Sequence, residues 1–246
     1  MPYKFRARRR KIAYKKTRRE PATEVARYKT LPNYVTKGSS TTRAMHIDRV
    51  PFPSKKMVKL PYNDVVTLTT VVGTGYPGAH TFNMSSIFDP NTTGTGHQPL
   101  YTDQLAAIYK RYRILGVAYK VTFFNHDTAS NYLVGVMATT DTGFYPSALP
   151  AVQLGEKRGA IIKNYSSETG KLVLKGYVPI AKLFGVSKST ILQENDYSAP
   201  FTSNPTKYAY LIVYAADASA ASGSIKAQVE LNYYGMVEEP VVVSTS

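Results

Sequence analysis

The first 19 residues carry the side chains with the clearest chemical potential, a dense run of cations without a single Asp or Glu. Guanidinium and ammonium groups at this density neutralise phosphates and release their counterions. The run therefore predicts binding to a nucleic-acid backbone with little sequence preference. Tyr3, Phe5 and Tyr14 lie between the charges, where their rings could stack on bases. The ten cations are Lys4, Arg6, Arg8, Arg9, Arg10, Lys11, Lys15, Lys16, Arg18 and Arg19.

Four further cations continue this charge toward the rest of the chain: Arg43, Arg49, Lys55 and Lys56. We predict that they extend the surface that meets the polyanion, although a solvated edge would have the same composition. The basic clusters at 8–11 and 15–19 also have the composition of a nuclear localisation signal. Nuclear import receptors are therefore a second expected partner of the same segment.

Catalytic constellations are hard to assemble from the remaining residues. The chain has no Cys, and its two closest histidines, His80 and His97, are 17 residues apart (97 − 80). The sequence GTGYPG at 73–78 fits G-x-G-x-x-G, but Pro77 and the strand-like residues after it offer no helix N-terminus for a pyrophosphate. We expect a protein that is not an enzyme and needs no metal or cofactor. A nuclease on a β-sandwich is the enzymatic alternative.

The net charge of the chain is confined to its first quarter. Residues 1–60 hold 18 Lys and Arg against three acids, a net of +15, whereas residues 61–246 hold 13 of each sign, a net of zero. This division predicts a basic arm and linker over residues 1–45 and a neutral body over residues 46–246. Because no run of 18 apolar residues occurs, we expect no membrane partner.

The body alternates apolar and polar residues with a period of two, which is typical of β-strands. In the segment 113–124, for example, Tyr119, Val121 and Phe123 share one face while Lys120 and Thr122 share the other. The pattern predicts a β-sandwich, with jelly-roll and immunoglobulin-like topologies both open. Short helical turns are expected near 102–109 and 180–188. The predicted strands are 57–72, 79–87, 113–124, 132–140, 159–165, 171–179, 207–216 and 224–236.

Tyrosine is unusually abundant, with 20 residues in the chain. Most of those in the body occupy strand positions, which predicts core and sheet packing. Since Tyr is also enriched at protein interfaces, the surplus favours contacts between subunits.

The order of these segments resembles the capsid proteins of circovirus-like viruses, whose genomes are circular single-stranded DNA. The resemblance rests on the basic N-terminus, on LYTDQLAAIYKRYRILGVAYKVTFFN at 100–125, and on the pair KYAYLIVYAA and SIKAQVELNYYG. The most specific part is a Y-x-x-Y-R-I stretch leading into a K-V-T-F strand. The arm is shorter and less purely Arg than in many circoviruses, and the missing Cys-His zinc pattern argues against the related geminivirus coat proteins.

The resemblance implies an eight-stranded jelly roll, an icosahedral T=1 shell of sixty copies, and an arm directed at packaged single-stranded DNA. It also implies residence in the virion, and in the host nucleus during assembly. Two other interpretations remain. A small RNA virus capsid would carry a similar arm, because phosphates are alike in both nucleic acids, and a monomeric cellular nucleic-acid-binding β-protein would bind without assembling.

Overall fold

The fold is that of a computed structural model, which describes residues 52–70, 77–124, 131–141, 149–166, 170–218 and 223–241. The predicted arm and linker, including Arg43 and Arg49, lie outside these residues, as does most of the GTGYPG sequence. The boundary expected at residue 46 therefore stays a prediction.

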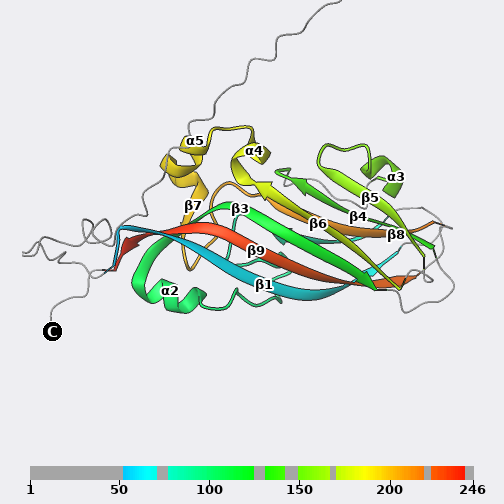
Figure 1. Ribbon diagram of the computed structural model, residues 1–246, viewed down its shortest axis with the longest axis horizontal. Helices are drawn as coiled ribbons and strands as arrows, with labels where there is room; N and C mark the ends of the chain where they lie inside the picture. Colours follow the sequence, from blue (N-terminus) through cyan, green and yellow to red (C-terminus); the bar gives the residue numbers. More distant parts are fainter. Residues whose placement is uncertain are drawn as a thin grey trace, which may run out of the picture. The chain divides into compact units, whose positions relative to one another are not determined.

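Two antiparallel sheets face each other across a common core (Figure 1). Sheet A has the order β1 (Lys55–Thr69), β9 (Ser224–Pro240), β3 (Tyr109–Phe124) and β6 (Lys171–Pro179), and the short β7 (Ser198–Pro200) also pairs with β3. Sheet B has the order β2 (Gly78–Asn83), β8 (Tyr210–Asp217), β4 (Asn131–Thr139) and β5 (Ala160–Ser166).

The strand order is that of a jelly roll. The strands pair as nested partners, β4 with β5, β3 with β6, β2 with β8 and β1 with β9, so the chain forms one long hairpin. Successive pairs of this hairpin lie in alternate sheets, which rolls it into a sandwich of eight strands. The predicted eight-stranded jelly roll is thereby confirmed, with β7 as an addition.

Alternating burial places the core between the sheets. In β1 the even-numbered residues from Leu60 to Leu68 point inward, and Tyr62 and Leu68 are almost fully buried. In β3, Val121 and Phe123 are fully buried while Lys120 is exposed, as the sequence pattern predicts. The predicted packing of tyrosines in the core is also confirmed, because the largest fully buried side chains include Tyr62, Tyr109, Tyr112, Tyr132, Tyr165, Tyr214 and Tyr233.

Short helices connect the strands. The helix predicted near 102–109 is α2 (Thr102–Ile108), and the turn predicted near 180–188 becomes two helices, α4 (Ile180–Phe184) and α5 (Lys188–Gln193). The sequence did not predict α3 (Ala151–Leu154), whose four residues are too few for a periodic signal. A single 3₁₀ turn, η3 (Asn195–Tyr197), precedes β7.

Some predicted strand limits need correction. The strand expected to end at residue 87 ends at Asn83, because the Asn83 side chain accepts hydrogen bonds from the backbone N–H and the hydroxyl of Ser85 and closes a turn. Strand β3 begins at Tyr109 rather than at Arg113. The cationic stretch between them pairs with the end of β9, which the local sequence cannot show.

Candidate nucleic-acid interface

Of the 14 residues predicted to bind nucleic acid, 12 lie outside the described residues, from Lys4 to Arg49. The other two, Lys55 and Lys56, are the first residues of β1, and both are exposed. The Lys55 ammonium lies 3.4 Å from a Glu238 carboxylate oxygen, with 55% of its side chain still exposed. The role of all 14 in binding stays a prediction.

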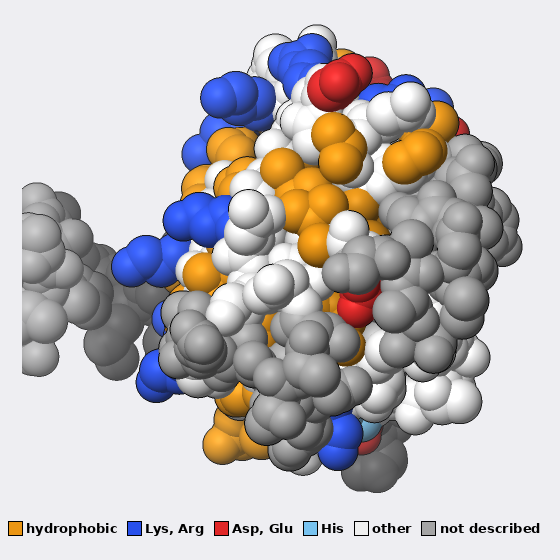
Figure 2. Space-filling view, turned by 90° about the vertical axis from the view of Figure 1, so that its right-hand side faces the viewer, with side chains coloured by type: hydrophobic (Ala, Val, Ile, Leu, Met, Phe, Trp, Pro, Cys, Tyr) orange, Lys and Arg blue, Asp and Glu red, His pale blue; other side chains and the backbone are white. Residues whose placement is uncertain are grey.

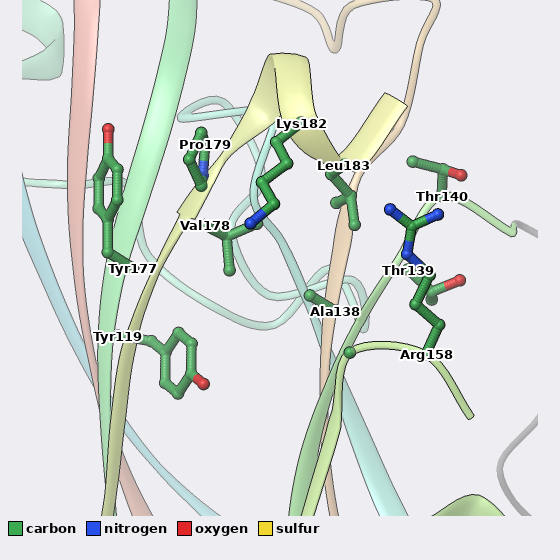
Figure 3. Close-up of a pocket in the computed structure, with 11 residues that line it drawn as sticks. Tyr119, Ala138, Thr139, Thr140, Arg158, Tyr177, Val178, Pro179, Lys182 and Leu183 are labelled. Carbon is green, nitrogen blue, oxygen red and sulfur yellow. The ribbon is translucent and has the colours of Figure 1, made fainter. Parts of the chain in front are cut away.

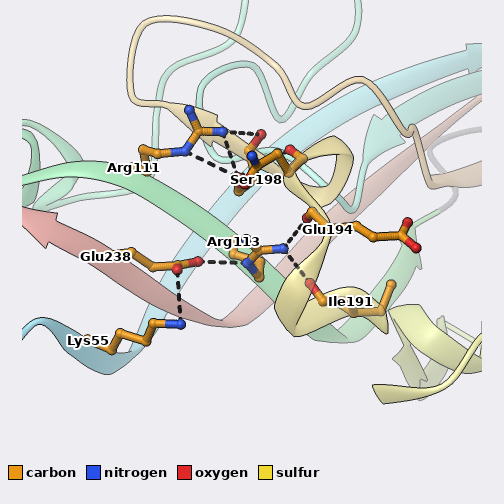
Figure 4. A network of polar contacts seen from close by, with 8 residues as sticks. Lys55, Arg111, Arg113, Ile191, Glu194, Ser198 and Glu238 are labelled. Atoms are coloured by element: carbon orange, nitrogen blue, oxygen red, sulfur yellow. Dashed lines mark hydrogen bonds and ion pairs between the residues drawn. The ribbon is translucent and has the colours of Figure 1, made fainter. Parts of the chain in front are cut away.

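The end of sheet A at which β1 begins is held by a buried ion pair (Figure 4). The Arg113 Nε donates to Glu238 Oε1 at 2.6 Å, joining β3 to β9, and the Arg113 side chain is only 3% exposed. Because Glu238 also meets Lys55, the first residue of β1 belongs to the same network.

The Arg113 guanidinium also caps the C-terminal end of helix α5. Its Nη1 donates to the backbone carbonyls of Ile191 and Glu194, which close the last turn of that helix. A cation at a helix C-terminus stabilises the unpaired carbonyls there. Arg111 plays a related part, since its guanidinium donates to the Ser198 hydroxyl at 2.7 Å and fixes β7 on β3. Arg111 and Arg113 therefore both stabilise the sheet and the segments packed on it.

A second group of cations lies on the outer side of sheet A. Register places Lys120 of β3 directly opposite Lys175 of β6, and Lys226 of β9 in the same row as Lys171 of β6. Lys59 of β1 lies over the Tyr234 ring, 5.6 Å from its centroid. We call this side of the sheet the lysine face, after its five lysines. Figure 2 shows that most of the visible Lys and Arg side chains in an end view of the molecule gather along its left side and top.

The lysine face contains one acid among its described residues between the rows of Lys59 and Lys171. Glu230 accepts a hydrogen bond from the Lys120 ammonium at 2.6 Å, and these side chains are 30% and 48% exposed. Five lysines and one glutamate leave a net of +4 (5 − 1). The sequence analysis assigned no role to these lysines. The alternation of apolar and polar residues could have identified these lysines, because each occupies an outward position in a predicted strand or at its edge.

The outer side of sheet B is different. Its residues Met137, Ile212 and Tyr214 are buried beneath Leu154 of α3, which is itself fully buried. This second, smaller core means that sheet B has apolar side chains on both of its faces. At these positions α3 separates sheet B from solvent, whereas the lysines of sheet A are exposed.

Two of the four histidines lie among the described residues, and each has a side-chain partner. The His80 Nε2 lies 2.9 Å from the Asn91 side-chain oxygen, and the His97 ring stacks on Tyr62 with the ring centroids 4.6 Å apart. Within the described ranges, no three His, Asp or Glu residues are grouped as a metal site would require. The helices of the described part are all too short or too polar to span a bilayer.

No protein-family model and no curated protein matches this chain. Solved structures do match it over most of its length. They include mud crab tombus-like virus, at 13% identity over 81% of this chain and 96% of the other, with a TM-score of 0.46. The decameric BFDV capsid protein matches at 11% identity over 75% and 99% of the two chains, with a TM-score of 0.45. Turnip yellow mosaic virus matches at 11% identity over 87% and 95%, with a TM-score of 0.43. The assignment of the jelly roll rests on the strand order of the two sheets.

Proposed function

We propose that this chain is a non-enzymatic capsid protein, which self-assembles into a small icosahedral shell and packages nucleic acid through residues 1–19. The observation that carries the proposal is that the net positive charge and the folded jelly roll lie in different parts of the chain. The net charge of +15 lies within residues 1–60, and the jelly roll is built almost entirely from residues whose charges cancel. A neutral body can approach copies of itself closely, while a polycation attached to it needs a polyanion.

Assembly and packaging reinforce each other by mass action. A polyanion that binds many arms raises the local concentration of bodies, and each contact between bodies brings further arms to the polyanion. Sixty arms with ten cations each would supply about 600 positive charges (60 × 10), enough to offset a substantial part of a genome of about a thousand or more nucleotides. Single-stranded DNA is the genome we favour, because of the resemblance stated above.

The body offers apolar surface for contacts between copies. Several large apolar side chains are exposed on the described residues, among them Met57, Leu100 and Val152. Exposed apolar groups mark association surfaces when they gather in patches.

The two basic clusters of the arm would serve nuclear import before assembly and genome binding after it.

Reversal of three arm charges tests the proposal. Replacing Arg8, Arg9 and Arg10 with Glu should leave particles that sediment as shells but hold much less nucleic acid after nuclease treatment, because phosphate contacts are lost. The matched control reverses three exposed body lysines, Lys110, Lys188 and Lys207, and so changes the net charge equally. Unchanged nucleic-acid content in the arm variant would contradict the proposed role of the arm in packaging.

A further inference from the structure

A groove opens between the edges of the two sheets, beside β6. It has a volume of about 470 Å³ and is lined by the end of β4, the turn before β5, and the junction of β6 with α4 (Figure 3). Lys182 of α4 and Arg158 of the turn enter it from opposite sides, with Leu183 between them. Thr139 and Thr140 supply two hydroxyl groups.

The lining of this groove suits an anion attached to an apolar group. None of its eleven lining residues is acidic. Two cations and two hydroxyls provide donors for phosphate oxygens, while Val178, Pro179 and Leu183 provide an apolar wall. A nucleotide has this combination of a phosphate and a flat, weakly polar base.

Tyr177 links the groove to the lysine face. It lines the groove, yet it stands on the outer side of β6 together with Lys171 and Lys175, and it is 55% exposed. Its ring lies over Gly116 of β3, where a Cβ atom would approach the Tyr177 hydroxyl to 2.2 Å. It also meets the Tyr234 ring edge to face, with the ring centroids 5.9 Å apart. These contacts hold an exposed aromatic ring in one orientation, which lowers the entropic cost of stacking a ligand on it.

We infer that single-stranded nucleic acid crosses the edge of sheet A at Tyr177. In this arrangement a base stacks on the Tyr177 ring. Phosphates on one side of it meet Arg158 and Lys182 in the groove, and phosphates on the other side meet Lys175 and Lys171. An aromatic platform flanked by cations is the general design of surfaces that bind single strands without reading sequence. The inference rests on the proposed function and adds a contact on the body to that of the arm.

Photo-crosslinking of assembled full-length protein gives the first test. Particles assembled with a single strand containing 5-bromodeoxyuridine are irradiated, and adducts are located by mass spectrometry. The expected result is an adduct on Tyr177 but none on Tyr101, a still more exposed tyrosine (67%) outside this surface. Adducts confined to residues 1–51, or equal adducts on Tyr101, would overturn the inference, as would a crosslink that shows the groove filled by a second copy of the chain.

The salt dependence of binding gives the second test. Each phosphate contact to a single strand contributes about 0.7 to the slope of log K against log salt. The double substitution Lys175→Gln and Lys182→Gln should lower that slope by about 1.4 for oligo(dT), whereas Lys207→Gln, an exposed lysine in the loop before β8, should leave it unchanged. Equal slopes for both variants would contradict the inference. Wild-type particles without nucleic acid would contradict the proposed function as well as this inference. Particles that contain nucleic acid crosslinked to the arm alone would contradict this inference but not the proposed function.

Discussion

The outer faces of the two sheets arise from the same alternation of residues but have different roles. On sheet B a group of outward positions is apolar and packs against α3, where Tyr214 and Leu154 are fully buried. On sheet A the outward positions carry five lysines, and Val173 and Tyr177 are exposed beside two of them. A sheet face that stabilises the fold is covered and apolar, whereas the lysine face contributes charge that the fold itself does not need. This difference is what makes sheet A the candidate for contact with a partner.

The largest expected difference in stability is between a variant of the buried Arg113 and a variant of a lysine on the lysine face. Arg113 and Lys120 both lie on β3, and each pairs with a glutamate of β9 at 2.6 Å, but only the first pair is buried. Arg113→Ala should lower the free energy of unfolding by about 3–5 kcal/mol, because two helix-end carbonyls lose their donor and Glu238 keeps only the more distant Lys55 of its two ion-pair partners. Lys120→Ala should cost about 0–1 kcal/mol, as exposed pairs do.

Urea unfolding followed by circular dichroism measures both variants. Equal losses would contradict the view that the lysine face is dispensable for folding.

The next effect should distinguish the two outer faces directly. Leu154→Ala removes fully buried apolar volume between α3 and sheet B, and should lower the free energy of unfolding by about 2–5 kcal/mol. Val173→Ala on the lysine face, where the side chain is partly exposed, should cost much less, within about 1 kcal/mol. Thermal denaturation of the two variants at one protein concentration compares them. A larger loss for Val173→Ala would mean that sheet A is also covered in solution.

A further loss of stability should appear in alkaline solution, above pH 10. Burial raises the pKa of Tyr112 and of Tyr214 to about 12, above the ordinary value of 10.0. Since the unfolded chain loses these protons near pH 10 and the folded chain keeps them, their contribution is complete below pH 10 and is lost as the pH rises toward 12. Urea midpoints at pH 8, 10 and 11.5 should therefore fall only in the last step. A midpoint that stays constant to pH 12 would contradict the burial of these phenols.

Local alternation was enough to predict most of the strands. The segment 171–179 coincides with β6, and the inward residues of β3 are those expected. What the sequence could not show depends on distant partners. Arg113 is 125 residues from Glu238, so the local sequence cannot show that this cation is buried and paired inside the strand. The groove beside β6 is likewise formed by residues from Tyr119 to Leu183 that only the rolled topology brings together.

The central claim is that the neutral body assembles and the basic arm packages. Sedimentation velocity of the expressed, nuclease-treated protein, followed at 260 and 280 nm, tests both parts at once. The account predicts a species near 1.6 MDa (60 × 27.2 kDa) with strong absorbance at 260 nm. A 27.2 kDa monomer that binds nucleic acid only at low salt would contradict it and would favour a monomeric nucleic-acid-binding protein.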